Sequence, residues 1–222
     1  DMAEIEPSSR LYRARGAQVM TATLPAGAES EAPVFGPLAF LLGTDVLVTL
    51  RYQAPKPFDT FPGRADQAAA APDTAPGVMI GLIDEIVDRI ADLLEQAGGR
   101  LDAVSREVFA ATGSDKTRPG DFQTALTRIG GEADFVARLR ACLVSLERVL
   151  GFFQQGLQQA GEDSRQARAL AKTQIRDVAA LTQHADALTQ QTTLLLDATL
   201  GLINIEQANI IKIFSVVAFV LL

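Results

Sequence analysis

The sequence predicts an α+β protein in three parts: a small α/β domain with antiparallel strands, a helical hairpin, and a very long C-terminal helix. Three observations support this class. Short β-rich runs, each bounded by Gly, Pro or Asp, occupy residues 1–53. From Val78 the apolar residues recur at helical spacing instead. No proline follows Pro119, which leaves the last part of the chain free to form long helices.

The N-terminal domain is expected to span residues 1–76. Weak alternation of apolar and polar residues predicts four strands in an antiparallel meander, at residues 9–14, 17–24, 38–42 and 46–52. So few strands form a marginal sheet unless helices cover one face. The chain begins without a lead-in to the first strand, so we expect the domain to be N-terminally incomplete, with an element before Asp1.

Residues 54–77 are rich in proline and alanine, and we expect a connection without strand or helix centres there. The helical hairpin then covers residues 77–160. Its first helix is expected to run from Val78 to about Phe109 and its second from about Asp121 to Gln159, with a kink at Gly130-Gly131.

The last part, residues 161–222, reads as one helix that starts polar and ends apolar, with Asp163 or Ser164 as its N-cap. Such a helix would be on the order of 90 Å long. A periodic run of this length is typical of a coiled coil or a membrane span. The apolar end from Ile210 has 13 residues and one charge, short of the roughly 20 residues that a span needs. We therefore expect a first membrane helix that is truncated at Leu222.

Composition excludes several function classes. The formal net charge of −7 argues against a nucleic-acid partner, because nucleic-acid-binding domains are usually basic. Cys142 is the single cysteine, so no internal disulfide is possible, which fits a reducing compartment. We expect Cys142 to be packed in a core, and His184 has no Cys or His at ligand spacing. Catalytic motifs and Gly-rich phosphate loops are absent, which predicts that the protein is not an enzyme and has no organic cofactor.

One line of the terminal helix, which we call the seam, recurs at alternating steps of four and three residues, the 3.5-residue period of helices that wind around each other. The seam consists of Asp197, Gly201, Asn204, Ala208, Ile211, Ser215, Ala218 and Leu222. These small or polar groups suit a water-filled axis, with Asp197 as an acidic ring, Asn204 as an amide ring, and Ile211 with Phe214 as an apolar gate. The alternative is an ordinary bundle helix with a small-residue packing face.

The residues from Leu200 to Leu222 resemble a known family. They read Leu-Gly-Leu-Ile-Asn-Ile-Glu-Gln-Ala-Asn-Ile-Ile-Lys-Ile-Phe-Ser-Val-Val-Ala-Phe-Val-Leu-Leu. This stretch closely resembles the start of the first membrane helix of CorA-type magnesium transporters, departing at Ala208, where that family often has Asn. The family's Gly-Met-Asn signature would be expected soon after Leu222. Residues 46–52, with the Pro-Phe loop after them, resemble the last strand of the family's cytoplasmic domain.

The resemblance implies a homopentamer in the cell inner membrane, with residues 1 to about 205 on the cytoplasmic side and the C-terminal helix entering the lipid bilayer. Each subunit would contribute a cytoplasmic α/β domain, two shorter helices packed on a stalk, and a long helix that lines the pore. Mg²⁺ would be both the transported ion and a regulator, since its loss from sites between cytoplasmic domains opens the ring. Members often also move Co²⁺ or Ni²⁺, and a related branch moves Zn²⁺.

The resemblance also suggests two regulatory Mg²⁺ ligands. Asp1 matches an acidic residue of the family, and Asp177 matches a local Arg-Asp-Val motif on the stalk. The alternative for Asp177 is a solvated helix carboxylate beside Arg176 without a metal role. Asp197 matches an acidic ring position that some family members have, and its alternative is an exposed charge on the stalk. Two other functions stay open: transport in the zinc branch, and a membrane-anchored helical adaptor without transport.

Overall fold

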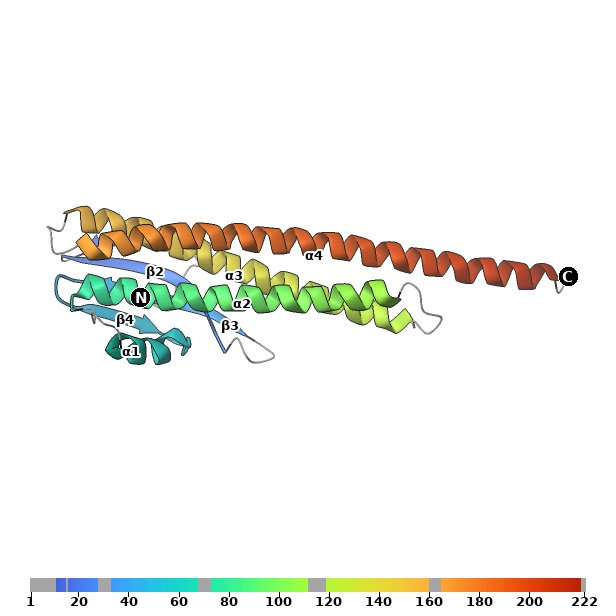
Figure 1. Ribbon diagram of the computed structural model, residues 1–222, viewed down its shortest axis with the longest axis horizontal. Helices are drawn as coiled ribbons and strands as arrows, with labels where there is room; N and C mark the ends of the chain where they lie inside the picture. The colour runs from blue at the N-terminus through green and yellow to red at the C-terminus, as the bar shows by residue number, and fades with distance from the viewer. Residues whose placement is uncertain are drawn as a thin grey trace. The chain divides into compact units, whose positions relative to one another are not determined.

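The computed structural model describes residues 11–14, 16–27, 33–67, 73–111, 119–159 and 165–220. Four strands and four helices occur there in the order that the sequence predicts, with one additional helix (Figure 1). The elements are β1 (Leu11–Ala14), β2 (Ala17–Ala26), β3 (Val34–Leu42), β4 (Leu47–Arg51), α1 (Pro57–Gln67), α2 (Ala75–Ala111), α3 (Pro119–Gln159) and α4 (Arg165–Val220). The predicted α+β class is confirmed.

The contacts within the chain define two compact units. Unit 1 consists of Asp1–Leu94 with Arg138–Ala185, and unit 2 consists of Glu95–Ala137 with Asp186–Leu222. Unit 1 therefore holds the sheet, α1 and one portion of each long helix, whereas unit 2 holds only the remaining portions of α2, α3 and α4.

The sheet in unit 1 is the predicted antiparallel meander, with strand order β1-β2-β3-β4. Its register pairs Met20 with Phe40 and Ala22 with Leu38. Paired residues share a face of the sheet, and all four of these side chains are buried. The sheet is therefore covered on one face, as expected for so few strands.

Helix α3 also contacts β2 beyond the residues that pair with β1. The backbone N–H of Thr23 donates a hydrogen bond to Ser145 Oγ at 3.0 Å, and the Ser145 hydroxyl donates in turn to the Cys142 carbonyl at 2.7 Å. A backbone donor of β2 is thus satisfied by a helix side chain. The side chain of Gln18 lies so close to Gly156 that a Cβ there would be 1.7 Å from its Nε2 atom.

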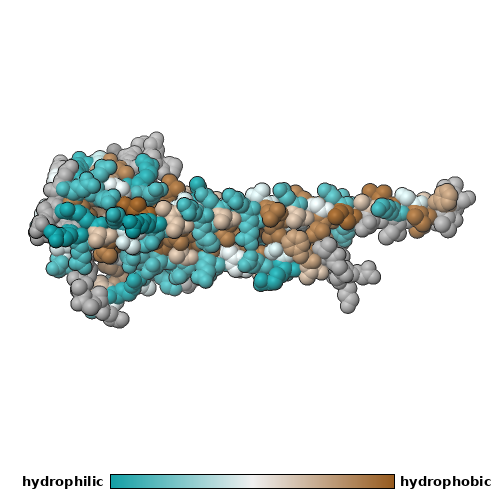
Figure 2. All heavy atoms as spheres, turned by 45° about the horizontal axis from the view of Figure 1, so that its top comes forward, coloured by the Kyte–Doolittle hydropathy of each residue, from teal (hydrophilic) through white to brown (hydrophobic). Residues whose placement is uncertain are grey.

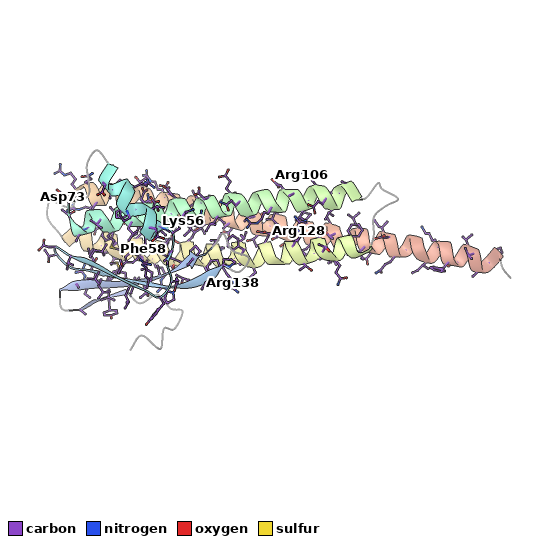
Figure 3. The ribbon with its side chains drawn as sticks, turned by 90° about the horizontal axis from the view of Figure 1, so that it is seen from below. Lys56, Phe58, Asp73, Arg106, Arg128 and Arg138 are labelled. Carbon is purple, nitrogen blue, oxygen red and sulfur yellow. The ribbon has the colours of Figure 1, made fainter. Side chains whose placement is uncertain are left out.

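The prediction that residues 54–77 contain no helix is wrong, because α1 covers Pro57–Gln67. Pro57 takes the first helical position, where its missing N–H has no partner to lose, and the helix continues past Pro62. Two ring contacts hold α1 in place. The Arg51 guanidinium lies 4.5 Å from the centre of the Phe58 ring, and Phe58 is labelled in Figure 3. The Phe61 ring occupies the space beside Gly81. Tertiary contacts here outweigh a weak local propensity.

Both hairpin helices are longer than predicted by a few residues, α2 beginning at Ala75 and α3 at Pro119. Helix α3 remains continuous through Gly130-Gly131. In unit 2 the three helix portions enclose a small core of their own. Its buried members are Val104, Val108, Phe122, Ala125, Ile129 and Leu195.

Candidate functional site

In unit 2, α4 presents one buried stripe to the core, and this stripe has the same heptad period as the seam. Buried positions recur at steps of four and three residues through Leu188, Thr192, Leu195 and Thr199. Thr199 is fully buried, and its hydroxyl is satisfied by the Leu195 carbonyl at 2.7 Å. Residues 188–199 therefore pack inside the chain with the same heptad period that the sequence predicts for the seam.

The seam follows the buried stripe at an offset of two residues, which is about 200° around an α-helix. Its described members are all exposed: Asp197, Gly201, Asn204, Ala208, Ile211, Ser215 and Ala218, together with the adjacent Phe214. Asp197, Gly201 and Asn204 lie on the side of α4 that faces away from the unit 2 core. From Gln207 onward every described position of α4 is exposed, so the exposure of Ile211 (65%) and Phe214 (71%) is shared by all faces of the helix there. The seam is thus available to another molecule. Leu222 lies outside the described residues.

Two polar side chains of the seam have no hydrogen-bond or ion-pair partner among the described residues. They are the Asp197 carboxylate and the Asn204 amide. A Cβ added at Gly201 would meet no atom within 4 Å. Ser215 differs, because its hydroxyl donates to the Ile211 carbonyl at 2.8 Å. Carboxylate and amide oxygens of this kind can order the water shell of a hydrated divalent cation.

Of the two predicted regulatory ligands, only Asp177 lies in the described part of the chain, on the unit 1 portion of α4. Its side chain is exposed. Asp1 lies outside the described residues. The described ranges contain no group of three or more His, Cys, Asp or Glu side chains that could hold a metal ion. A metal held by Asp177 would therefore need ligands from another chain or from water.

The C-terminal part of α4 carries many hydrophobic side chains, drawn in brown in Figure 2. They include Ile211, Val216, Val217 and Phe219, all of them exposed. Nevertheless, a search of the described helices finds none with an apolar stretch long enough for a bilayer crossing.

Comparison with known proteins identifies the family. The family model described as "CorA-like Mg2+ transporter protein" matches residues 2–222. The chain belongs to the CorA-like Mg²⁺ transporter family. This confirms the resemblance seen in the sequence, and the family is one of transporters rather than enzymes.

Individual relatives agree with the family assignment. The magnesium transport protein CorA of Yersinia pseudotuberculosis serotype I is 30% identical over 185 residues, covering 83% of this chain and 56% of its own length. The chain thus spans little more than half of such a CorA relative. Among solved structures, the complete CorA magnesium transporter from Methanocaldococcus jannaschii superposes with a TM-score of 0.75 at 14% identity, covering 95% of this chain and 63% of that one. The ZntB cytoplasmic domain from Vibrio parahaemolyticus gives 0.66 at 8% identity, covering 88% and 73%.

Cys142 is unsuited to metal binding in this CorA-family chain. Cys142 is fully buried, and burial raises the pKa of its thiol to about 12. A thiol that stays protonated is neither a nucleophile nor a good metal ligand, in agreement with the predicted packing role. His184 is exposed on α4.

One charged cluster was not anticipated. On the polar face of α2, Asp84, Glu85 and Asp88 surround the guanidinium of Arg64 from α1. The Arg64 nitrogens lie 2.5 Å from Glu85 Oε2, 3.0 Å from Asp88 Oδ2 and 3.4 Å from Asp84 Oδ2. Thr60 of α1 donates a further hydrogen bond to Glu85 Oε1 at 2.6 Å. These carboxylates hold α1 against α2.

Asp84 also connects this cluster to α4, since Gln174 Nε2 donates to Asp84 Oδ1 at 2.5 Å. Partial burial raises the pKa of Asp84, and the neighbouring Asp88 carboxylate adds to the rise, while Arg64 opposes it. The sequence signal that could have revealed the cluster is the start of α1. Pro57 at a first helical position and Asp59 in the first turn are both favourable at a helix N-terminus.

Proposed function

We propose that this chain is the cytoplasmic and stalk portion of a CorA-type channel that conducts Mg²⁺ across the cell inner membrane as a homopentamer. Family membership supports the ion, because the relative from Yersinia pseudotuberculosis is named a magnesium transport protein. Co²⁺ and Ni²⁺ are proposed as further ions that the same pore accepts. Residues 1 to about 205 would stand in the cytoplasm, and the remaining part of α4 would enter the bilayer.

The exposed seam on α4 carries this proposal. A helix that packs its buried stripe inside one subunit needs a different face for its neighbours, and the seam offers small and polar groups there. Five copies around an axis would form successive rings of Asp197, Asn204 and Ile211. Carboxylates concentrate cations, amides can bind the outer water of a hydrated ion, and an apolar ring can close the path by excluding water.

Regulation by Mg²⁺ would act through assembly. A cation that bridges Asp177 of one subunit and Asp1 of the next stabilises the closed ring, because a ligand that binds only the assembled state favours that state by mass action. The exposure of Asp177 supports this role. Mg²⁺ retains several waters and needs few protein carboxylates, so one from each neighbour suffices for a weak sensor site.

The test expresses the gene in a bacterium that lacks its own Mg²⁺ transporters and measures ²⁸Mg²⁺ uptake. Asn204→Leu replaces the amide ring by a bulky apolar ring, and uptake should fall at least about tenfold, because the water shell of the ion loses its polar partners. Gln207→Leu is the matched control, since Gln207 is also exposed but lies off the seam. Equal uptake by the Asn204→Leu variant and the parent would remove α4 from the conduit.

The same assay separates the alternatives when it is repeated with Zn²⁺, Co²⁺ and Ni²⁺. The fold likeness to the ZntB cytoplasmic domain makes a zinc-transporting protein the second candidate. Preferential Zn²⁺ flux would favour that branch. An absence of flux for every metal would favour a membrane-anchored helical adaptor.

A further inference from the structure

Two pairs of adjacent glycines lie inside the long helices of unit 2. Gly98-Gly99 lies inside α2, a helix of 37 residues, and Gly130-Gly131 lies inside α3, a helix of 41 residues. Both pairs are far from the helix ends, where glycine commonly terminates a helix. In a helix interior, glycine loses more conformational freedom on folding than alanine and weakens the helix locally.

The two glycine pairs lie at nearly the same level of the α2–α3 pair. Arg100, which directly follows the first pair, binds Glu132, which directly follows the second, through Nε–Oε1 at 2.5 Å and Nη2–Oε2 at 2.9 Å. Further along, Arg128 of α3 binds Glu107 of α2 (Arg128 is labelled in Figure 3). Residue numbers thus rise in one helix as they fall in the other. In this antiparallel register, the two glycine pairs are displaced from each other by about one helical turn along the helix axes.

Packing explains only one of the four glycines. A Cβ at Gly98 would lie 3.3 Å from Leu188 Cδ2 of α4, a tight contact. At Gly99, Gly130 and Gly131 an added Cβ would meet no atom within 4 Å. These three positions are exposed, so a larger side chain would fit without displacing any neighbour. Their glycines weaken both helices without serving the close approach of another element.

Side-chain contacts hold the helices together at this level. The bidentate Arg100–Glu132 pair joins α2 to α3, and the Arg100 guanidinium also lies 5.5 Å from the Phe135 ring centre. On α4, Gln191 Nε2 donates to Asp102 Oδ1 of α2 at 2.9 Å. The weak backbone is therefore combined with lateral contacts that long side chains can maintain during a small bend.

We propose that the paired glycines form a flexible joint at which α2 and α3 bend together without separating. Sharp bends in helices have identifiable causes, and adjacent small residues such as glycine are among them. Because Leu188 contacts Gly98 inside the joint, bending at this level also changes the surface against which α4 packs. The joint is a property of unit 2 alone and does not depend on which ion, if any, the protein conducts.

The first test measures backbone amide exchange by mass spectrometry on the whole 222-residue chain. The variant Gly99→Ala/Gly130→Ala/Gly131→Ala leaves the tight Gly98 position unchanged. Exchange around residues 96–103 and 128–135 should slow by about fivefold for each substitution, the factor that corresponds to the helix preference of alanine over glycine. Gly151→Ala is the control, since Gly151 also lies inside α3 with no atom within 4 Å of its added Cβ. It should slow exchange only near residue 151, and unchanged exchange at the joint in the triple variant would overturn the proposal.

The second test measures bending directly. Spin labels at the exposed positions Glu95 and Ala110 flank Gly98-Gly99 on α2, with Cys142→Ala to keep the labelling specific. In a straight helix these positions are about 22 Å apart. The distance distribution in the parent should be broad and should become narrow in the triple alanine variant. A parent distribution as narrow as that of the triple variant would refute the joint, as would equal narrowing by Gly151→Ala.

Discussion

At the scale of single residues, the charged side chains differ in what they do although the sequence makes them look alike. Asp177 and Asp197 are exposed on α4, whereas Asp84 is partly buried between Arg64 and Gln174. Exposed charges are free to meet another molecule, but a partly buried carboxylate mainly affects the stability of its own subunit.

Asp84→Asn is expected to stabilise the protein at pH 7 and to lose this advantage in acid. The pKa of Asp84 is raised in the folded state, so folding favours the protonated form of this side chain. The resulting contribution to stability is fully present below the unfolded pKa, near 4, and is lost as the pH rises through the folded pKa. Asparagine resembles the protonated acid and keeps an oxygen for Gln174. Urea unfolding of parent and variant at pH 7 and pH 4 measures the difference.

The control for this prediction is Asp92→Asn, an exposed carboxylate on the same helix. Its effect on the free energy of unfolding should be small at both pH values. If Asp84→Asn instead destabilises the protein equally at pH 7 and pH 4, the carboxylate contributes through its hydrogen bonds and not through its charge.

At the scale of elements, α3 supports the sheet through contacts that sequence periodicity does not reveal. Ser145 reaches the backbone of β2, and the Arg138 guanidinium lies 5.7 Å from the Phe35 ring centre on β3. Serine at position 145 follows no apolar pattern, and its role depends on where the helix meets β2.

Ser145→Ala should reduce the free energy of unfolding by about 1–2 kcal/mol, because the Thr23 N–H loses its acceptor at a partly buried site. Chemical denaturation measures this loss. Ser145→Thr retains the hydroxyl and should recover most of the stability. Equal losses in both variants would show that side-chain volume at this position, and not the hydrogen bond, decides stability.

At the scale of the whole molecule, α4 buries one face in its own chain and leaves another face exposed. The buried stripe and the seam have the same heptad period and are two residues out of step. Such a helix can complete the core of its own subunit and also contact neighbouring copies. The proposed pentamer depends on this division of α4 into two faces.

Assembly should therefore depend on Mg²⁺. Light scattering of the chain in millimolar Mg²⁺ should give a larger mass than in chelator, and thermal melting should shift upward. At a Mg²⁺ concentration 100 times the dissociation constant, mass action contributes about 2.7 kcal/mol. Asp177→Ala should abolish both effects, whereas Asp66→Ala, an exposed acid on α1, should leave them unchanged. A chain that remains monomeric and melts independently of Mg²⁺ would support the adaptor function instead.

The linear pattern of residues was sufficient to predict the strands, the meander, the long helices and the family, because each of them depends on local periodicity or on a contiguous motif. The buried stripe of α4 from Leu188 to Thr199 has the same heptad period that the sequence predicts from Asp197 onward. Only the tertiary structure revealed that α1 forms across a proline-rich stretch, since Phe58, Phe61 and Arg64 obtain their partners from Arg51, Gly81 and the acids of α2. The same holds for the outward direction of the seam, because which face of a helix is buried depends on the neighbours that pack against it.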